Sequence, residues 1–190
     1  MRFGALIVNV SMGAESGGNM FPGVTVPFGV VKLGIDVMPP PGTGDPYSGY
    51  HPLGNVTGFS MMHESGTGGS PKYGVVSQLP VVGDVVNPLL DYAVPRAAGD
   101  EAKLGYYKAQ LANGVVVELA AEHHVGMMRH TFAGGPQVKN VLVDVSHFLP
   151  SFRGLGFEQH YVGGSIRLYP DGKYKGYGTY NGGWNYGEVF

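Results

Sequence analysis

Glycine and proline are spread so densely through this chain that long helices are disfavoured. The 190 residues include 33 glycines and 14 prolines, and one or the other interrupts nearly every window long enough for a helix. Inside a helix, glycine costs about 1 kcal/mol relative to alanine and proline about 3 kcal/mol. No long segment keeps a 3.6-residue apolar period. This pattern favours short strands joined by tight turns, because glycine adopts turn conformations that other residues avoid.

Two pairs of segments have the pattern of β-hairpins. Tyr106–Ala112 and Val115–Glu122 are joined by Asn113-Gly114, the strongest two-residue hairpin signal, because both residues tolerate a positive φ. Ser165–Tyr169 and Lys173–Tyr180 flank a Pro-Asp-Gly turn. The sequence therefore predicts two antiparallel strand pairs.

Two further segments favour strands. Val138–Val145 has the apolar centre of a buried strand, and Val24–Leu33 predicts a strand bent at Pro27 and Gly29. With the hairpins, these segments predict an all-β fold, an antiparallel β-sandwich of two packed sheets (supersandwich-like) with few or no helices.

Prolines and polar residues mark the loops. Met38–His51 is too rich in proline for a central strand and predicts a long ordered loop, and Asn87–Glu101 predicts another. Trp184–Phe190 has the pattern of a strand that stops at its opening. We therefore expect the chain to be incomplete at its C-terminal side, with an unsatisfied sheet edge or an exposed apolar face there.

Charge and cysteine content exclude several functional classes. The formal net charge is −2 and only 14% of residues are charged, so electrostatics give no reason to expect nucleic acid or an anionic membrane as a partner. The apolar runs are too short to span a bilayer, and the first ten residues lack the pattern of a signal peptide. The absence of cysteine excludes disulfides, thiol nucleophiles and cysteine metal clusters.

The most specific signals are two glycine-rich segments, Gly18–Gly29 (GNMFPGVTVPFG) and Gly58–Gly69 (GFSMMHESGTGG). In order and spacing they resemble the N-terminal domain of glycoside hydrolase family 92, the calcium-dependent exo-acting α-mannosidases. The resemblance continues in order through Leu104–Leu119, Arg129–Asp144 and Gly163–Trp184. It therefore covers nearly all of the chain.

The resemblance implies that residues 1–190 are one β-sandwich domain that packs on a helical (α/α) barrel. Full-length members release terminal α-linked mannose from glycans with inversion, using carboxylates that lie mostly on the barrel and a calcium ion. Because the barrel is absent from these residues, we expect the chain to be incomplete for catalysis, with no catalytic residue or calcium ligand assigned to it. The implied partners are a mannose-containing glycan and the barrel, and the implied location is secreted or periplasmic.

Five residues are candidates for sugar binding. His63 and Glu64 lie on a loop whose glycines allow the backbone to approach a ligand closely. Asp36 follows a predicted strand, and Tyr47 and Tyr50 lie in the proline-rich loop, where aromatic faces suit the apolar face of a pyranose. For the tyrosines the alternative is packing of the loop onto the sandwich, and for His63 it is the capping of a turn.

One position departs from the family pattern. The related loop commonly reads Gly-Phe-Ser-His-x-His, but here the first histidine position is Met61, so one polar contact to a sugar is lost if both imidazoles bind it. His123-His124 does not predict a metal site, because consecutive side chains of a strand point to opposite faces. Two alternatives to an enzyme domain remain: a stand-alone carbohydrate-binding module and a scaffold that has lost its site.

Overall fold

The described part of the chain consists of antiparallel β-sheet joined by loops. The structure is a computed structural model that describes residues 12–14, 18, 20–43, 48–63, 72–151, 155–182 and 188–189. Among these residues there is no helix, and so none long and apolar enough to cross a membrane. The predicted all-β class is confirmed.

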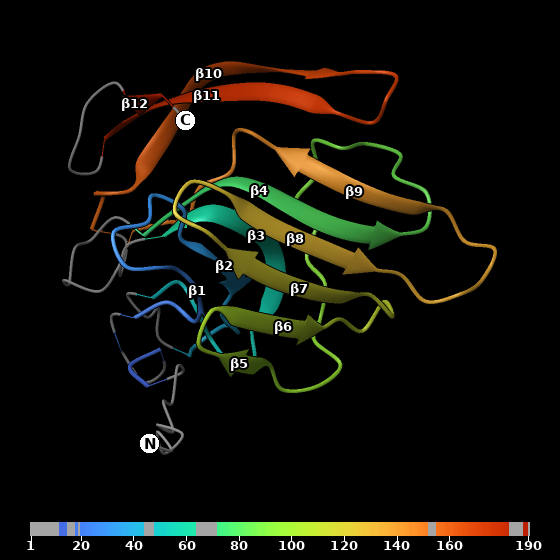
Figure 1. Ribbon diagram of the computed structural model, residues 1–190, viewed down its shortest axis with the longest axis horizontal. Coiled ribbons are helices and arrows are strands. Elements are labelled where there is room, and N and C mark those ends of the chain that lie inside the picture. The colour runs from blue at the N-terminus through green and yellow to red at the C-terminus, as the bar shows by residue number, and fades with distance from the viewer. Residues whose placement is uncertain are drawn as a thin grey trace, which may run out of the picture.

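Two sheets form the sandwich, and a third lies beside it (Figure 1). The five-stranded sheet has the order β1-β2-β3-β4-β9, with β1 at Gly23–Val24, β2 at Leu33–Met38, β3 at Asn55–His63, β4 at Tyr73–Val82 and β9 at Lys139–Asp144. The four-stranded sheet runs β5 (Glu101–Lys103), β6 (Tyr106–Gln110), β7 (Val116–Ala121) and β8 (Gly126–Thr131). The third sheet comprises β10 (Gln159–Leu168), β11 (Tyr174–Gly182) and β12 (Glu188–Val189).

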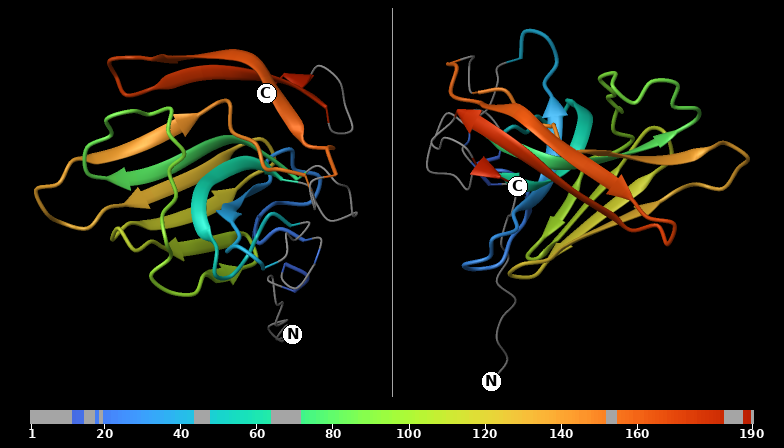
Figure 2. Two further views of the ribbon diagram at one scale, coloured as in Figure 1. Left: turned by 180° about the vertical axis from the view of Figure 1, so that it is seen from behind. Right: turned by 90° about the horizontal axis from the view of Figure 1, so that it is seen from above.

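The core lies where the two larger sheets pack against each other (Figure 2). Strands β6 and β7 alternate between buried and half-buried residues, the pattern of a sheet with one face on the core. From this sheet Tyr107 and Val117 are almost fully buried, and from the five-stranded sheet Ile35 and Phe59 are. Burying such side chains contributes about 1.5–3 kcal/mol each, so this layer holds the two sheets together.

The third sheet is anchored to the sandwich by two tyrosines. The hydroxyl of the buried Tyr180 lies 2.5 Å from the carbonyl oxygen of Val145, and Gln78 donates a 2.7 Å hydrogen bond to the Tyr174 hydroxyl. The hairpin runs alongside β9, beyond the edge of the five-stranded sheet (Figure 1). Its exposed large apolar side chains are Tyr161, Val162, Ile166, Leu168, Tyr174 and Tyr177. The predicted open edge or apolar face at the C-terminal end of the chain stays a prediction, because most of residues 183–190 lie outside the described ranges.

Both predicted hairpins are confirmed. Strands β6 and β7 pair in register through the Asn-Gly turn, in which Gly114 has a φ of +82°. Strands β10 and β11 pair over nearly their whole length, and Gly172 has a φ of +80° in their turn. In each turn glycine occupies the left-handed conformation that the chain reversal requires.

Two strand predictions need correction. Val24–Leu33 is not one strand, because β1 ends at Val24 and β2 begins at Leu33. Between them Gly29 donates to the Val26 carbonyl in a turn, with Phe28 at a φ of +60°. Val138–Val145 does contain β9, but this strand is the edge of its sheet and is not buried, since Val141 is 40% exposed. Apolar composition alone does not distinguish an edge strand from a central one.

We expect Gly74→Ala to destabilise the fold more than Gly105→Ala does. Both glycines have a φ near +70°, at +71° and +73° respectively. A Cβ on Gly74 would lie 2.5 Å from Cγ of Leu149, whereas a Cβ on Gly105 would meet nothing within 4 Å. The shared backbone strain costs about 1–2 kcal/mol, and the clash adds about 1–3 kcal/mol at Gly74 only. Urea unfolding of the two variants measures the difference, and equal losses would contradict this packing.

Candidate functional site

A fully buried carboxylate organises the candidate site. Asp36, in β2, has no exposed surface and accepts hydrogen bonds from two imidazoles. Its Oδ1 lies 2.7 Å from Nε2 of His63, and its Oδ2 lies 3.0 Å from Nε2 of His147. Both oxygens are therefore occupied by N–H donors, which compensates part of the cost of burying the charge. We call these three residues the Asp36 cluster.

His63 is held at both ring nitrogens. Its Nδ1 lies 2.9 Å from the backbone carbonyl oxygen of Lys32, an acceptor, while Nε2 faces the Asp36 carboxylate. Because both partners accept, the geometry fits the imidazolium, in which both nitrogens donate. Phe21 stacks on the ring with centroids 4.8 Å apart, and the Ser60 hydroxyl lies 3.3 Å from Nε2. With 1% of its surface exposed, His63 is fixed on every side.

A bulge in the pairing of β3 with β4 lies beside His63. In a regular strand Met61 and His63 would point to the same face of the sheet. The pairing of β3 with β4 shifts register between Met62 and His63, where Gly74 is the extra residue on β4. His63 meets Ser60 and Asp36, while Met61 packs against the hydrophobic core. The Met61 position therefore does not extend the cluster.

His147 belongs to the site although sequence reasoning did not identify it. It lies in the loop after β9, and its backbone carbonyl oxygen is 3.1 Å from the Tyr180 hydroxyl. Its partner Asp36 is 111 residues away in the sequence. No local motif marks such a contact, and a histidine after a buried-looking strand was the only available signal.

Charge within the cluster shifts two pKa values. Burial alone would raise the pKa of the Asp36 carboxyl, but the charge of His63 and the hydrogen bonds from both histidines hold it well below its ordinary value. Burial alone would lower the pKa of His147, but the hydrogen bond and charge of Asp36 raise it above 6.5, with Asp144 and Asp91 adding in the same direction. The Asp36 carboxyl is thus held in its ionised form at neutral pH.

Tyr50 lies in a different network. Its hydroxyl donates to Oδ2 of Asp100 at 2.8 Å and accepts from Nη1 of Arg96 at 3.0 Å. Arg96 also lies over the Tyr50 ring, 5.0 Å from its centroid, and donates to the backbone carbonyls of His51 and Gly54. Burial and the neighbouring Asp100 raise the pKa of Tyr50 to about 12. Tyr50 therefore packs its loop onto the sandwich, as the alternative interpretation holds.

The other two sequence candidates, Tyr47 and Glu64, lie outside the described residues. Among the candidates inside them, the structure brings together Asp36 and His63 and separates Tyr50 from both. Asp36 and His63 are buried, so neither is accessible to a ligand in this structure. Their predicted contact with sugar remains a prediction.

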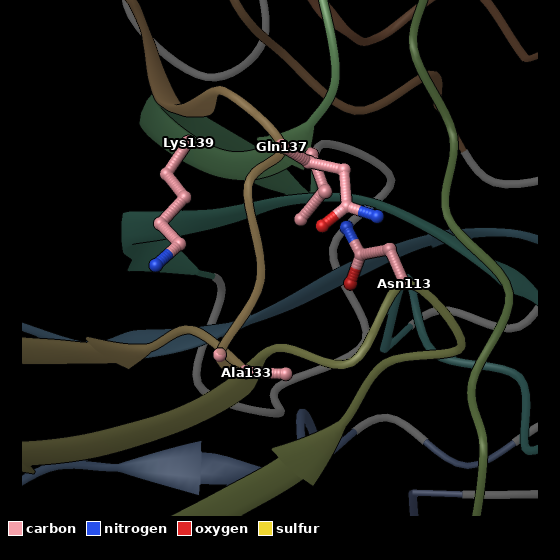
Figure 3. Close-up of a pocket in the computed structure, with 6 residues that line it drawn as sticks. Asn113, Ala133, Gln137 and Lys139 are labelled. Carbon is pink, nitrogen blue, oxygen red and sulfur yellow. The ribbon is translucent and has the colours of Figure 1, made fainter.

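A hollow of about 190 Å³ lies at the opposite end of β4 from His63 (Figure 3). The carboxamides of Asn113 and Gln137 face each other there, and Lys139 is its only charged lining residue. Asn113 also caps its own turn, accepting from the Val115 amide and donating to the Pro80 carbonyl. The carboxamide of Asn113 is thus already used to hold this turn in place. The Asp36 cluster is therefore the stronger candidate site.

The described residues do not fit a calcium ion. Calcium takes six to eight oxygen ligands, usually from carboxylates, carbonyls and water. The Asp36 cluster contains one carboxylate, and both of its oxygens already accept hydrogen bonds from imidazoles. Elsewhere in the described ranges, no group of three His, Cys, Asp or Glu side chains is arranged to hold a metal ion.

We expect Asp36→Asn to lower the free energy of unfolding by about 3–5 kcal/mol, because it leaves His63 buried without its charged partner. Asp84→Asn, a change of the same chemistry at an exposed loop position, is the matched control and should stay within about 0.5 kcal/mol. Denaturant unfolding at neutral pH measures both. A near-neutral Asp36→Asn would show that the ion pair adds nothing to the fold.

The stability of the protein should fall as pH rises above about 6.5. The folded pKa of His147 is raised, so its contribution is fully present below the unfolded pKa and is lost as pH passes through the folded value. Asp36 acts oppositely: its folded pKa is lowered, so its contribution is lost only in acid. Urea unfolding between about pH 5 and about pH 9 should show the alkaline loss in the wild type and not in His147→Gln. Parallel curves for the two proteins would contradict this assignment.

Comparison with known proteins places the chain in a family. The model of the glycosyl hydrolase family 92 N-terminal domain matches residues 7–190. An uncharacterized secreted glycosidase of Arthroderma benhamiae is 33% identical over 152 residues, which cover 73% of this chain and 19% of that protein.

Two solved structures share the fold. A family GH92 α-mannosidase of Bacteroides thetaiotaomicron, solved in complex with mannoimidazole, superposes with a TM-score of 0.76 at 25% identity, covering 96% of this chain and 24% of that one. A family GH92 inverting mannosidase of the same organism gives a TM-score of 0.65 at 22% identity, covering 94% and 22%. The chain therefore spans about a fifth to a quarter of the length of these relatives. It belongs to the glycosyl hydrolase family 92 N-terminal domain family.

Proposed function

We propose that this chain is the N-terminal β-sandwich domain of an exo-acting α-mannosidase that releases terminal α-linked mannose from glycans, including N-glycans, with inversion. The observation that carries the proposal is the match of the family model to residues 7–190. The fold shared with an α-mannosidase that binds mannoimidazole supports the same substrate class. In this reading the domain supplies one wall of the sugar site and does not catalyse alone.

The chemistry of inversion bears on which domain supplies the catalytic carboxyl groups. Inverting glycosidases need two carboxyl groups about 6.5–9.5 Å apart, so that water fits between the base and the sugar. In the described residues the Asp36 carboxylate is buried and committed to two imidazoles. As the family resemblance implies, we assign the acid, the base and the calcium ligands to a second, helical barrel domain of the protein. The exposed apolar side chains of β10 and β11 are consistent with packing against further protein.

The candidate residues take graded roles in this proposal. Glu64 and Tyr47 are proposed to contact the glycan directly. Asp36 and His63 are proposed to shape the sugar site from beneath its surface, because both are buried. Tyr50 is proposed to support the loop that carries Tyr47, through its bonds to Asp100 and Arg96. A secreted or periplasmic location is proposed by analogy with the secreted relative.

The test is an assay of the full-length protein that contains this domain, with α-mannobiose as substrate. We expect mannose to be released as the β-anomer, as an inverting mechanism requires, with activity lost on calcium chelation and restored by calcium. Proton NMR during the first turnovers identifies the anomer. An α-glucoside disaccharide serves as the control substrate and should not be cleaved. A protein that binds α-mannobiose without cleaving it would instead favour the carbohydrate-binding module.

A further inference from the structure

His147 is anchored through one ring nitrogen only. Its Nε2 donates to Asp36, which fixes the tautomer of the neutral ring and leaves the lone pair on Nδ1. Within the described residues, Nδ1 makes no hydrogen bond, and it is not among the buried polar atoms that lack a partner. The side chain keeps 16% of its surface exposed, whereas Asp36 and His63 keep 0% and 1%. His147 is therefore the member of the cluster that outside molecules can reach.

The backbone that carries His147 is fixed on both sides. Before it, the Val145 carbonyl accepts from the hydroxyl of the buried Tyr180. After it, the Leu149 amide donates to the Tyr73 carbonyl at 2.7 Å, and the Leu149 side chain fills the space left by the missing Cβ of Gly74. Both ends of the loop segment are thus held by residues from other strands. Such support is what holds a ligand-contacting side chain in one position before the ligand arrives.

Backbone strain is concentrated beside the same cluster. Of the three non-glycine residues with a positive φ in the described ranges, two lie at the start of β4: Tyr73 at +66° and Val76 at +57°. Tyr73 pairs directly with His63. A positive φ is a costly conformation for a β-branched residue such as valine, and strain of this kind gathers at ligand sites.

We propose that His147 is a ligand-contacting residue whose Nδ1 hydrogen-bonds a sugar hydroxyl, and that Asp36 is the positioning residue that holds its ring. This inference rests on the proposed function for the choice of ligand. A hydroxyl both donates and accepts, so it pairs with the imidazole in either protonation state. A metal ion would need further ligands, and the described residues do not arrange them. In this proposal His147, the exposed member of the cluster, makes the direct sugar contact that the sequence predicts for His63.

Two substitutions of His147 distinguish a hydrogen bond to the ligand from a hydrogen bond that only supports the fold. The amide of glutamine reaches about as far as Nε2, so His147→Gln keeps the bond to Asp36 and removes the group at Nδ1. The shorter asparagine places its amide near Nδ1, so His147→Asn removes the bond to Asp36 instead. Calorimetric titration of the full-length protein with mannoimidazole measures binding, and thermal unfolding measures the fold. His124→Gln, at an exposed histidine in the loop between β7 and β8, is the control.

We expect His147→Gln to weaken mannoimidazole binding about tenfold, the usual effect of losing one hydrogen bond. Its melting temperature should match that of the wild type at about pH 9, where neither protein carries a charge at this position. His147→Asn should melt at a lower temperature and bind more tightly than His147→Gln does. Wild-type affinity in His147→Gln would overturn the inference and leave the proposed function standing. If the wild type itself does not bind mannoimidazole, the proposed function fails and the inference fails with it.

The positioning role of Asp36 has a spectroscopic test. Asp36, Asp144 and Asp91 all favour the charged form of His147, and Asp36 alone is in contact with its ring. NMR titration of the His147 ring should therefore give a lower midpoint in Asp36→Asn than in the wild type. Asp144→Asn, which removes a charge without removing the contact, should shift it less. An unchanged midpoint in Asp36→Asn would overturn the positioning role.

Discussion

The Asp36 carboxylate is the interaction on which the organisation of this domain depends. It is fully buried, and each of its oxygens accepts one hydrogen bond from an imidazole, from His63 at 2.7 Å and from His147 at 3.0 Å. An unpaired charge at this depth would cost several kcal/mol, so the fold must deliver both histidines together. Strands β2 and β3 and the loop after β9 are therefore tied to one another at this point, and the anchoring of that loop by Tyr180 follows from the same need.

Different constraints hold the two ends of the sandwich. Around the Asp36 cluster the contacts are ionic, the backbone is strained at Tyr73 and Val76, and the pairing of β3 with β4 shifts register beside His63. At the other end of β4 the hollow is lined by two carboxamides, of which that of Asn113 caps its own turn and bonds to Pro80. The apolar layer between the sheets supplies general stability, so the strained end can be shaped for ligands. This asymmetry is our reason for proposing that the sugar-facing wall lies at the cluster.

Local patterns predicted both hairpin turns and the strands β6, β7, β9, β10 and β11, but not the long central strands β3 and β4. They failed where neighbouring elements decide the structure. Asn113-Gly114 needed no tertiary information, because its preference for positive φ is intrinsic. The position of β9 at a sheet edge was not predictable, because Val141 has the same composition in an edge strand as in a central one. The separate third sheet was not predicted either. The local sequence predicts that β10 and β11 form a hairpin, but it does not indicate whether that hairpin joins one of the two larger sheets.

The sequence by itself determined the β class, the hairpins and the family, because glycine placement, turn chemistry and collinear motifs are all properties of neighbouring residues. It also drew attention to Asp36 and His63, though as separate candidates. Only the tertiary structure decided that these two are buried partners, that Tyr50 belongs with Asp100 and Arg96, and that His147 completes the cluster. Contacts between residues 36 and 147 depend on how the sheets fold back on each other, which no local spacing encodes.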